Sequence, residues 1–116
     1  MKNKIITNKK TGVSKEYNSA GQLVRQFTEV NGKLEGEEKW WFLPRVLFAL
    51  INYKNGKKEG ELRNWHTNGQ ISLLAIYKNG KMEGVCKLRD NYGQLTNRNF
   101  YKNNLQFGQQ TIFKNH

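Results

Sequence analysis

The chain has 116 residues, the size of one domain, and its 36% hydrophobic content is too low to fill the space between two packed sheets. Its formal net charge of +11 favours an acidic partner or protects solubility, although heavy Lys and Asn usage also fits an AT-rich genome. The single cysteine excludes an intrachain disulfide, no apolar leader opens the chain, and the longest apolar segment, 40–51, is too short to span a membrane, so we expect a cytoplasmic protein.

Five glycines stand 24 residues apart along the chain: Gly12, Gly36, Gly60, Gly84 and Gly108. A fixed spacing with recurring neighbours indicates one small unit copied in tandem, whose copies must stack to bury a core. The single domain 1–116 therefore divides into a half repeat 1–11, repeats 12–35, 36–59, 60–83 and 84–107, and a partial repeat 108–116. An aromatic residue or arginine follows each glycine by five residues: Tyr17, Trp41, Trp65, Arg89 and Phe113.

Two turn signals recur in each unit. Asn-Gly stands at 31–32, 55–56 and 79–80, with Asn103-Asn104 as a degenerate copy, and it predicts tight type I′ hairpin turns. A second reversal is predicted at Gly21, Gly69 and Gly93, each followed by Gln. In the second unit Arg45 takes the place of that glycine.

These signals predict an all-β fold: an elongated antiparallel β-meander of tandem 24-residue β-hairpin repeats, with about ten strands in one twisted or curled sheet. A short strand is expected within 5–11, and the others over 13–18, 23–30, 37–43, 46–54, 61–66, 71–78, 85–90, 95–102 and 109–114. The one alternative is a helix over 45–53, because Pro44 suits a first helical position.

Pairing across the Asn79-Gly80 turn is expected to set Tyr77 opposite Met82 and diagonal to Gly84, where its ring would shield the glycine backbone. The same arrangement is expected for Tyr53 over Gly60 and Tyr101 over Gly108. A bulge at the glycine would reverse the alternation of faces, so the faces that carry Tyr17 and Trp65 stay open.

The hairpin of repeat 36–59 is apolar on both faces. Strict alternation would place Leu47, Ala49, Ile51 and Tyr53 on one face with Ile71, Leu73, Ala75 and Tyr77, and Val46, Phe48 and Leu50 on the other. Two-sided apolar character means that something covers the second face. Either the sheet folds over itself there, or the hairpin is an exposed patch rich in the aromatic residues that anchor interfaces.

The units with the pattern Tyr-x-Asn-Gly-x-x-x-Gly resemble the bacterial variant of the MORN-repeat family, from Gly12 to Gly108 and best from Tyr53 to Gly84. The resemblance implies β-hairpin repeats and a protein-interaction module of the kind often labelled an antitoxin, while some eukaryotic relatives are credited with phospholipid binding. The chain departs from the family pattern in the Gly36 unit, at Arg89 and at Asn104.

Catalytic groups are sparse. The chain has two histidines, His66 and His116, and one aspartate, Asp90, with no metal-ligand spacing, nucleophile elbow or phosphate-binding loop. A carboxylate recurs before the repeat glycine, at Glu35, Glu59 and Glu83, which is typical of a solvated or ion-paired ladder. We therefore expect no enzyme activity, no metal and no cofactor.

Lysines flank the Asn-Gly turns, which should lie along one sheet edge: Lys33, Lys54, Lys57, Lys58, Lys78, Lys81 and Lys102. Such an edge would suit a phosphate backbone or an anionic headgroup surface, or it would simply protect exposed strands. The acidic ladder beside it cancels part of the field.

The function expected is that of a non-catalytic protein-binding module, most concretely a neutralising partner (antitoxin or inhibitor) of an acidic protein. The predicted partner-binding residues are aromatic anchors and steering lysines: Trp40, Trp41, Phe42, Phe48, Trp65, Lys54, Lys57, Lys58, Lys78 and Lys81. The alternatives are direct binding of nucleic acid or an anionic membrane by the lysine edge, and a homodimer formed through the apolar hairpin.

Overall fold

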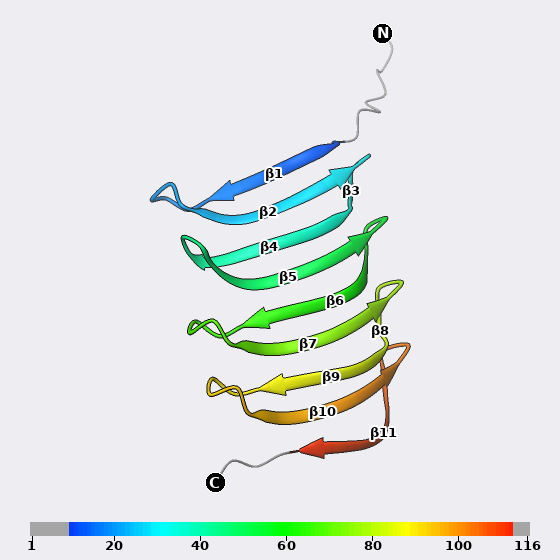
Figure 1. Ribbon diagram of the computed structural model, residues 1–116. Coiled ribbons are helices and arrows are strands. Elements are labelled where there is room, and N and C mark those ends of the chain that lie inside the picture. The colour runs from blue at the N-terminus through cyan, green and yellow to red at the C-terminus, as the bar shows by residue number, and fades with distance from the viewer. Residues whose placement is uncertain (1–9, 113–116) are drawn as a thin grey trace.

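The computed structural model describes residues 10–112, and the side chains of residues 10–107. It shows an all-β chain whose eleven strands form one open antiparallel sheet (Figure 1). The strands are β1 (Gly12–Tyr17), β2 (Leu23–Val30), β3 (Lys33–Leu34), β4 (Gly36–Leu43), β5 (Val46–Lys54), β6 (Lys57–Trp65), β7 (Ile71–Lys78), β8 (Lys81–Met82), β9 (Gly84–Arg89), β10 (Leu95–Lys102) and β11 (Leu105–Ile112). They lie side by side in chain order, as a meander requires, with the two-residue strands β3 and β8 paired to β2 and β7.

The predicted meander is confirmed, and β2, β5, β7 and β10 have the predicted bounds. The helical alternative over 45–53 is wrong, because this segment is strand β5. Strands β6 and β11 begin earlier than predicted, directly after the turns that precede them. The half-repeat strand expected within 5–11 and the residue Phe113 fall largely or wholly outside the described residues.

The Asn-Gly turns stack on one another along one edge of the sheet. Asn55 and Asn79 have φ of 51° and 52°, and the glycines after them 82° and 84°, as type I′ turns require. The N–H of each turn glycine donates to a carbonyl of the previous repeat, at 2.8 Å from Gly56 to Leu34 and 2.8 Å from Gly80 to Lys58. The repeats are therefore linked by backbone hydrogen bonds at every turn of this edge.

The glutamate ladder takes part in the same stacking. The Asn55 N–H donates to Glu35 Oε1 at 2.9 Å, and the Asn79 N–H donates to Glu59 Oε1 at 2.8 Å. Glu83 accepts from the Asn103 N–H in the same way. The prediction of a solvated or ion-paired ladder is therefore corrected: these carboxylates are acceptors that hold the next turn in place.

The opposite edge carries the second set of reversals. In two of them a side-chain oxygen, Asn18 Oδ1 or Asp90 Oδ1, accepts two backbone N–H groups of the loop. The reversals predicted at Gly69 and Gly93 are confirmed, and both glycines adopt positive φ. In repeat 36–59 Arg45 adopts the same left-handed conformation with φ of 67°, although it has a Cβ.

A β-bulge recurs near the start of the second long strand of each repeat. Trp40 pairs with Ala49 and Trp41 with Leu47, which leaves Phe48 as the extra residue. Equivalent register shifts leave an extra residue at Val24, Ser72 and Thr96. A bulge reverses the alternation of side chains along the strand. Residues before the bulge therefore lie on the opposite face from the one that strict alternation, counted from the residues after it, assigns to them.

Because of the bulges, some residues lie on the opposite face of the sheet from the one predicted. A continuous row of paired residues runs across the sheet and defines what we term the Trp40 face: Arg25, Trp40, Ala49, Asn64, Leu73 and Leu88. Leu47 and Ile71 lie opposite Trp41 and Trp65 instead, on the other face, and Phe48 turns toward the Trp40 face. Tyr17, at the position equivalent to Trp41 and Trp65, lies opposite Leu23. The faces of Tyr17 and Trp65, which the sequence left open, are therefore both the face that carries Trp41.

The expected register of the tyrosines against the repeat glycines is wrong. Tyr77 does pair with Met82 across its turn, but the glycine directly opposite Tyr77 is Gly60, on the other neighbouring strand. Tyr53 likewise pairs with Gly36, and Tyr101 with Gly84. The register differs because the chain bends between the turn and the repeat glycine, so that Leu74 pairs with Lys87 beyond the bend.

The core is thin and lies on one side of the sheet. The buried apolar side chains of the described residues are Ala49, Leu62, Ala75 and Cys86. The sheet stays an open single layer, so it neither curls nor folds over the apolar hairpin as one interpretation of the sequence required (Figure 1). Phe42 and Leu43 at the tip of that hairpin are 41% and 61% exposed.

Candidate functional site

An apolar hollow of about 460 Å³ opens on the Trp40 face and crosses four adjacent strands, β4 to β7. Its lining is Trp40, Phe48, Ala49, Ile51, Leu62, Asn64, Leu73 and Tyr77. The register explains this grouping, because the Trp40–Ala49–Asn64–Leu73 row and the neighbouring Ile51–Leu62 pair lie on the same face. The buried residues Ala49 and Leu62 form the floor of the hollow, and the larger side chains surround them.

Three aromatic side chains gather at one end of the hollow. The ring centroids of Phe42 and Phe48 are 4.5 Å apart, and those of Trp40 and Phe48 are 6.3 Å apart. The bulge at Phe48 makes this cluster possible, since it turns Phe48 toward Trp40. Three of the predicted anchors, Trp40, Phe42 and Phe48, therefore lie together.

The other two predicted aromatic anchors lie elsewhere. Trp41 lines a separate hollow of about 250 Å³ with Leu23, Pro44 and Arg45. Trp65 is half-buried opposite Ile71 and lines neither hollow. The predicted aromatic set is thus divided between two faces, because consecutive residues of a strand point to opposite sides.

Three polar groups in or beside the hollow have no hydrogen-bond partner among the described residues: the Trp40 indole N–H, the Asn64 amide and the Tyr77 hydroxyl. Burial raises the pKa of Tyr77, and Cys86 and Tyr101 raise it further, so its hydroxyl stays protonated at neutral pH. The Lys58 ammonium lies 5.0 Å from the Tyr77 ring centroid. Asn64, Leu62 and Leu73 were missed by sequence reasoning, because only the strand register places them beside Trp40.

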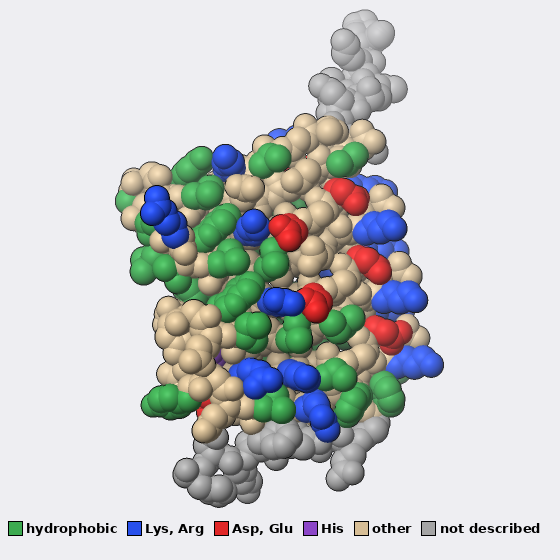
Figure 2. Space-filling view, viewed as in Figure 1, with side chains coloured by type: hydrophobic (Ala, Val, Ile, Leu, Met, Phe, Trp, Pro, Cys, Tyr) green, Lys and Arg blue, Asp and Glu red, His purple; other side chains and the backbone are tan. Residues whose placement is uncertain are grey.

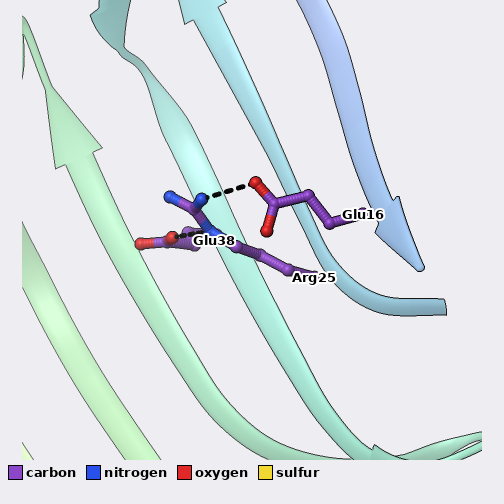
Figure 3. A network of polar contacts seen from close by, with 3 residues as sticks. All are labelled: Glu16, Arg25 and Glu38. Atoms are coloured by element: carbon purple, nitrogen blue, oxygen red, sulfur yellow. Dashed lines mark hydrogen bonds and ion pairs between the residues drawn. The ribbon is translucent and has the colours of Figure 1, made fainter. Parts of the chain in front are cut away.

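A charged network borders the hollow beyond Trp40, and it too was missed. Arg25 of β2 donates from Nε to Glu38 of β4 at 2.6 Å and from a terminal nitrogen to Glu16 of β1 at 2.9 Å (Figure 3). Glu38 is only 3% exposed. The Arg25 guanidinium also lies 4.9 Å from the Trp40 ring centroid.

The network perturbs the acidity of its members. Burial alone lowers the pKa of Arg25, but the hydrogen bond and charge of Glu38, followed by Glu16, outweigh it and hold that pKa above its ordinary value. Burial first, and then the charge and hydrogen bond of Glu38, raise the pKa of Tyr53 to about 12. Arg25 therefore stays charged and is already occupied by two carboxylates.

The lysine edge forms two repeated polar hollows between successive Asn-Gly turns, of about 410 Å³ and 440 Å³. Each is lined by three lysines and one glutamate: Lys33, Lys54 and Lys57 with Glu59, then Lys57, Lys78 and Lys81 with Glu83. Figure 2 shows the two signs of charge alternating along this edge, on the right of the view. Of the predicted lysines, Lys58 lies apart from the exposed edge, because it is half-buried beside Tyr77.

Among the described residues, no three His, Cys, Asp or Glu side chains lie close enough together to hold a metal ion. The His66 ring Nε2 lies 2.9 Å from the Arg89 carbonyl oxygen and so links two neighbouring loops. The described part of the chain contains no helix of the length and apolarity needed to cross a bilayer.

Comparison of the chain with protein-family models, curated proteins and solved structures gives no match. The apolar hollow with its aromatic end, and the lysine edge, are thus the two surfaces from which a function can be argued.

Proposed function

We propose that the chain is a non-catalytic protein-binding module of the MORN-like kind, which acts in the cytoplasm as the neutralising partner, an antitoxin or inhibitor, of an acidic protein. One observation carries the proposal: the hollow from Trp40 to Tyr77 is apolar and uncovered. A chain with so thin a core gains nothing in stability from leaving this surface open to water. Open apolar surface of this kind marks interaction sites.

The charge distribution supports an acidic partner. Lys54, Lys57, Lys78 and Lys81 are exposed, and none of them forms an ion pair within the described part of the chain. Free positive charge at the rim accelerates encounter with a negative surface, whereas the apolar centre supplies the affinity. The two surfaces therefore have complementary roles in one binding event.

The test is capture of a partner from a lysate of the native host by the wild-type chain and by Phe48→Asp. Phe48→Asp places a charge in the aromatic cluster and is expected to abolish capture. Val13→Asp is the matched control, since Val13 lies on β1 away from the hollow and is 59% exposed. Far-ultraviolet circular dichroism shows whether each variant is folded. Equal capture by folded Phe48→Asp and by Val13→Asp would refute the proposal.

A second candidate is direct binding of nucleic acid or an anionic membrane, and the repeated three-lysine hollows favour it. Binding of this kind must weaken steeply with salt, because each neutralised phosphate releases counterions. Gel-shift and liposome assays at ~50 mM salt test it, with Lys57→Glu as the charge-reversed variant shared by both hollows. Absence of binding under those conditions eliminates this candidate.

A further inference from the structure

We infer that the hollow on the Trp40 face binds a proline-rich segment in the polyproline II conformation, with acidic residues at one end. The inference rests on the proposed function and specifies the chemistry of the partner segment. It is carried by the unpaired polar groups in the hollow, by the pairing of the strands beneath it and by the spacing of the repeats.

The first support is that residues lining the hollow carry hydrogen-bond donors that are open to solvent and are not used within the described part of the chain. The Trp40 indole N–H, the Asn64 amide and the Tyr77 hydroxyl make no hydrogen bond with any other described residue. Trp N–H and Tyr O–H groups usually find a partner once they are buried. A ligand that covers them must bring acceptors of its own, or its binding leaves buried polar groups unpaired.

The second support concerns the regular backbone conformation that could bring those acceptors to the hollow. Strands β4 to β7 each pair with a neighbour on both sides, so a ligand cannot join this part of the sheet as an added strand. An α-helix uses its own carbonyls within the helix and has none to offer along its side. A polyproline II segment has no internal hydrogen bonds, so its carbonyls are free, and aromatic-lined grooves are its usual receptors.

The third support is a match of spacing. Equivalent residues of successive repeats are two strands apart, roughly 9.4–9.8 Å. One turn of polyproline II advances about 9.3 Å in three residues. A segment lying across the strands therefore presents the same side to each repeat, and four or five residues, at about 3.1 Å each, cover the roughly 14 Å from β4 to β7.

Charge sets the flanking residues of the segment. At the Tyr77 end of the hollow the Lys58 ammonium lies over the tyrosine ring and forms no ion pair with a described residue. At the Trp40 end Arg25 is neutralised by Glu38 and Glu16. An acidic residue just beyond the prolines is thus attracted to the Lys58 end and gains nothing at the Arg25 end.

The experiment titrates the full chain with three synthetic peptides and follows its backbone amides by NMR. The probe has about nine prolines followed by glutamates; one control replaces the prolines by alanine, and the other replaces the glutamates by lysine. The proline–glutamate probe is expected to shift the amides of the hollow and to bind about ten-fold more tightly than either control. Equal binding of the alanine control, or no shift at roughly millimolar probe, overturns the inference.

Two conservative variants test the donors. Tyr77→Phe removes only the hydroxyl, and Asn64→Leu places the side chain that Leu88 already has at the equivalent position of the next repeat. Each is expected to weaken binding of the probe about five-fold, while Tyr92→Phe, at a side chain 79% exposed, leaves it unchanged. Unchanged affinity in both hollow variants refutes the role of the donors and with it the inference.

Three further outcomes bear on this inference and on the proposed function. If the amides of the hollow shift with protein concentration alone, a second copy of the chain occupies the hollow and the inference fails. If a partner is captured in a Phe48-dependent way and no peptide binds, the inference fails while the proposed function stands. If the peptide binds and capture is indifferent to Phe48→Asp, the inference stands and the proposed function fails.

Discussion

Replacing Arg25 by leucine isolates the energetic role of the charged network. Glu38, which is 3% exposed, would lose its cation, and loss of one partner of a buried ion pair costs about 3–5 kcal/mol. The lower end applies, because the Arg25 side chain is itself 22% exposed and Tyr53 continues to donate to Glu38. We therefore expect Arg25→Leu to lower the free energy of unfolding by about 3 kcal/mol, a large share of the total for a small domain.

The double variant Arg25→Leu/Glu38→Leu distinguishes a buried charge from lost packing. Leucine suits both positions, since Leu62 and Leu73 occupy their equivalents in later repeats. With no charge left to bury, the double variant is expected to recover to within about 1 kcal/mol of the wild type. Urea unfolding followed by tryptophan fluorescence measures all three proteins.

Lys39→Met is the control for loss of a cation, because its ion pair with Glu37 is long, at 3.7 Å, and exposed. It is expected to cost less than about 0.5 kcal/mol. A loss in Arg25→Leu no larger than in Lys39→Met would refute the reasoning. So would a double variant as unstable as Arg25→Leu, since the cost would then lie in packing.

Three further predictions concern the turns and the tyrosines. Arg45→Gly removes a side chain from a left-handed backbone with φ of 67°, and we expect a gain of about 0.5–1 kcal/mol in urea unfolding; a loss would show that the Arg45 side chain matters more than its backbone. Glu59→Ala removes the acceptor of the Asn79 N–H and is expected to cost about 1 kcal/mol, whereas Glu59→Gln keeps an acceptor and costs less, so equal losses in a thermal melt would contradict this role. Because the folded pKa of Tyr53 is raised from 10.0 to about 12, the stability that this group contributes is present below pH 10 and is lost as the pH rises to about 12. Tyr53→Phe is therefore expected to flatten that part of the stability–pH curve, and an unchanged slope would count against the assignment.

The strands and turns could be predicted because their signals are local. The Asn-Gly pairs demand a left-handed backbone, and the Asn residues of all three pairs, like both residues of the degenerate Asn103-Asn104 copy, have positive φ. Because the glycines from Gly12 to Gly84 recur at a regular spacing, the hairpin predicted for one repeat could be assigned to every repeat of the array. The largest errors in the bounds are at Lys57 of β6 and Leu105 of β11, where pairing begins directly after a turn, and β1, β4 and β9 also begin one residue earlier than predicted.

The site could be predicted only in part, because faces and neighbours depend on register. Three of the predicted anchors, Trp40, Phe42 and Phe48, lie together, whereas Trp41 and Trp65 lie apart from them on the other face. The bulge at Phe48 has no single-residue signature, since Val24, Ser72 and Thr96 share its position but not its chemistry. Sequence alone therefore could not show that Phe48 and Ala49 line one hollow.

The sequence by itself determined the repeat, the turn conformations and the all-β class, because glycine and asparagine act on the backbone within a few residues of themselves. The tertiary structure decided which strand residues meet. Arg25, Glu38 and Glu16 come from three strands, and Trp40, Asn64 and Tyr77 from three others, so their contacts exist only once the register is fixed. Register depends on bulges and on side-chain packing across strands, and these belong to the assembled sheet.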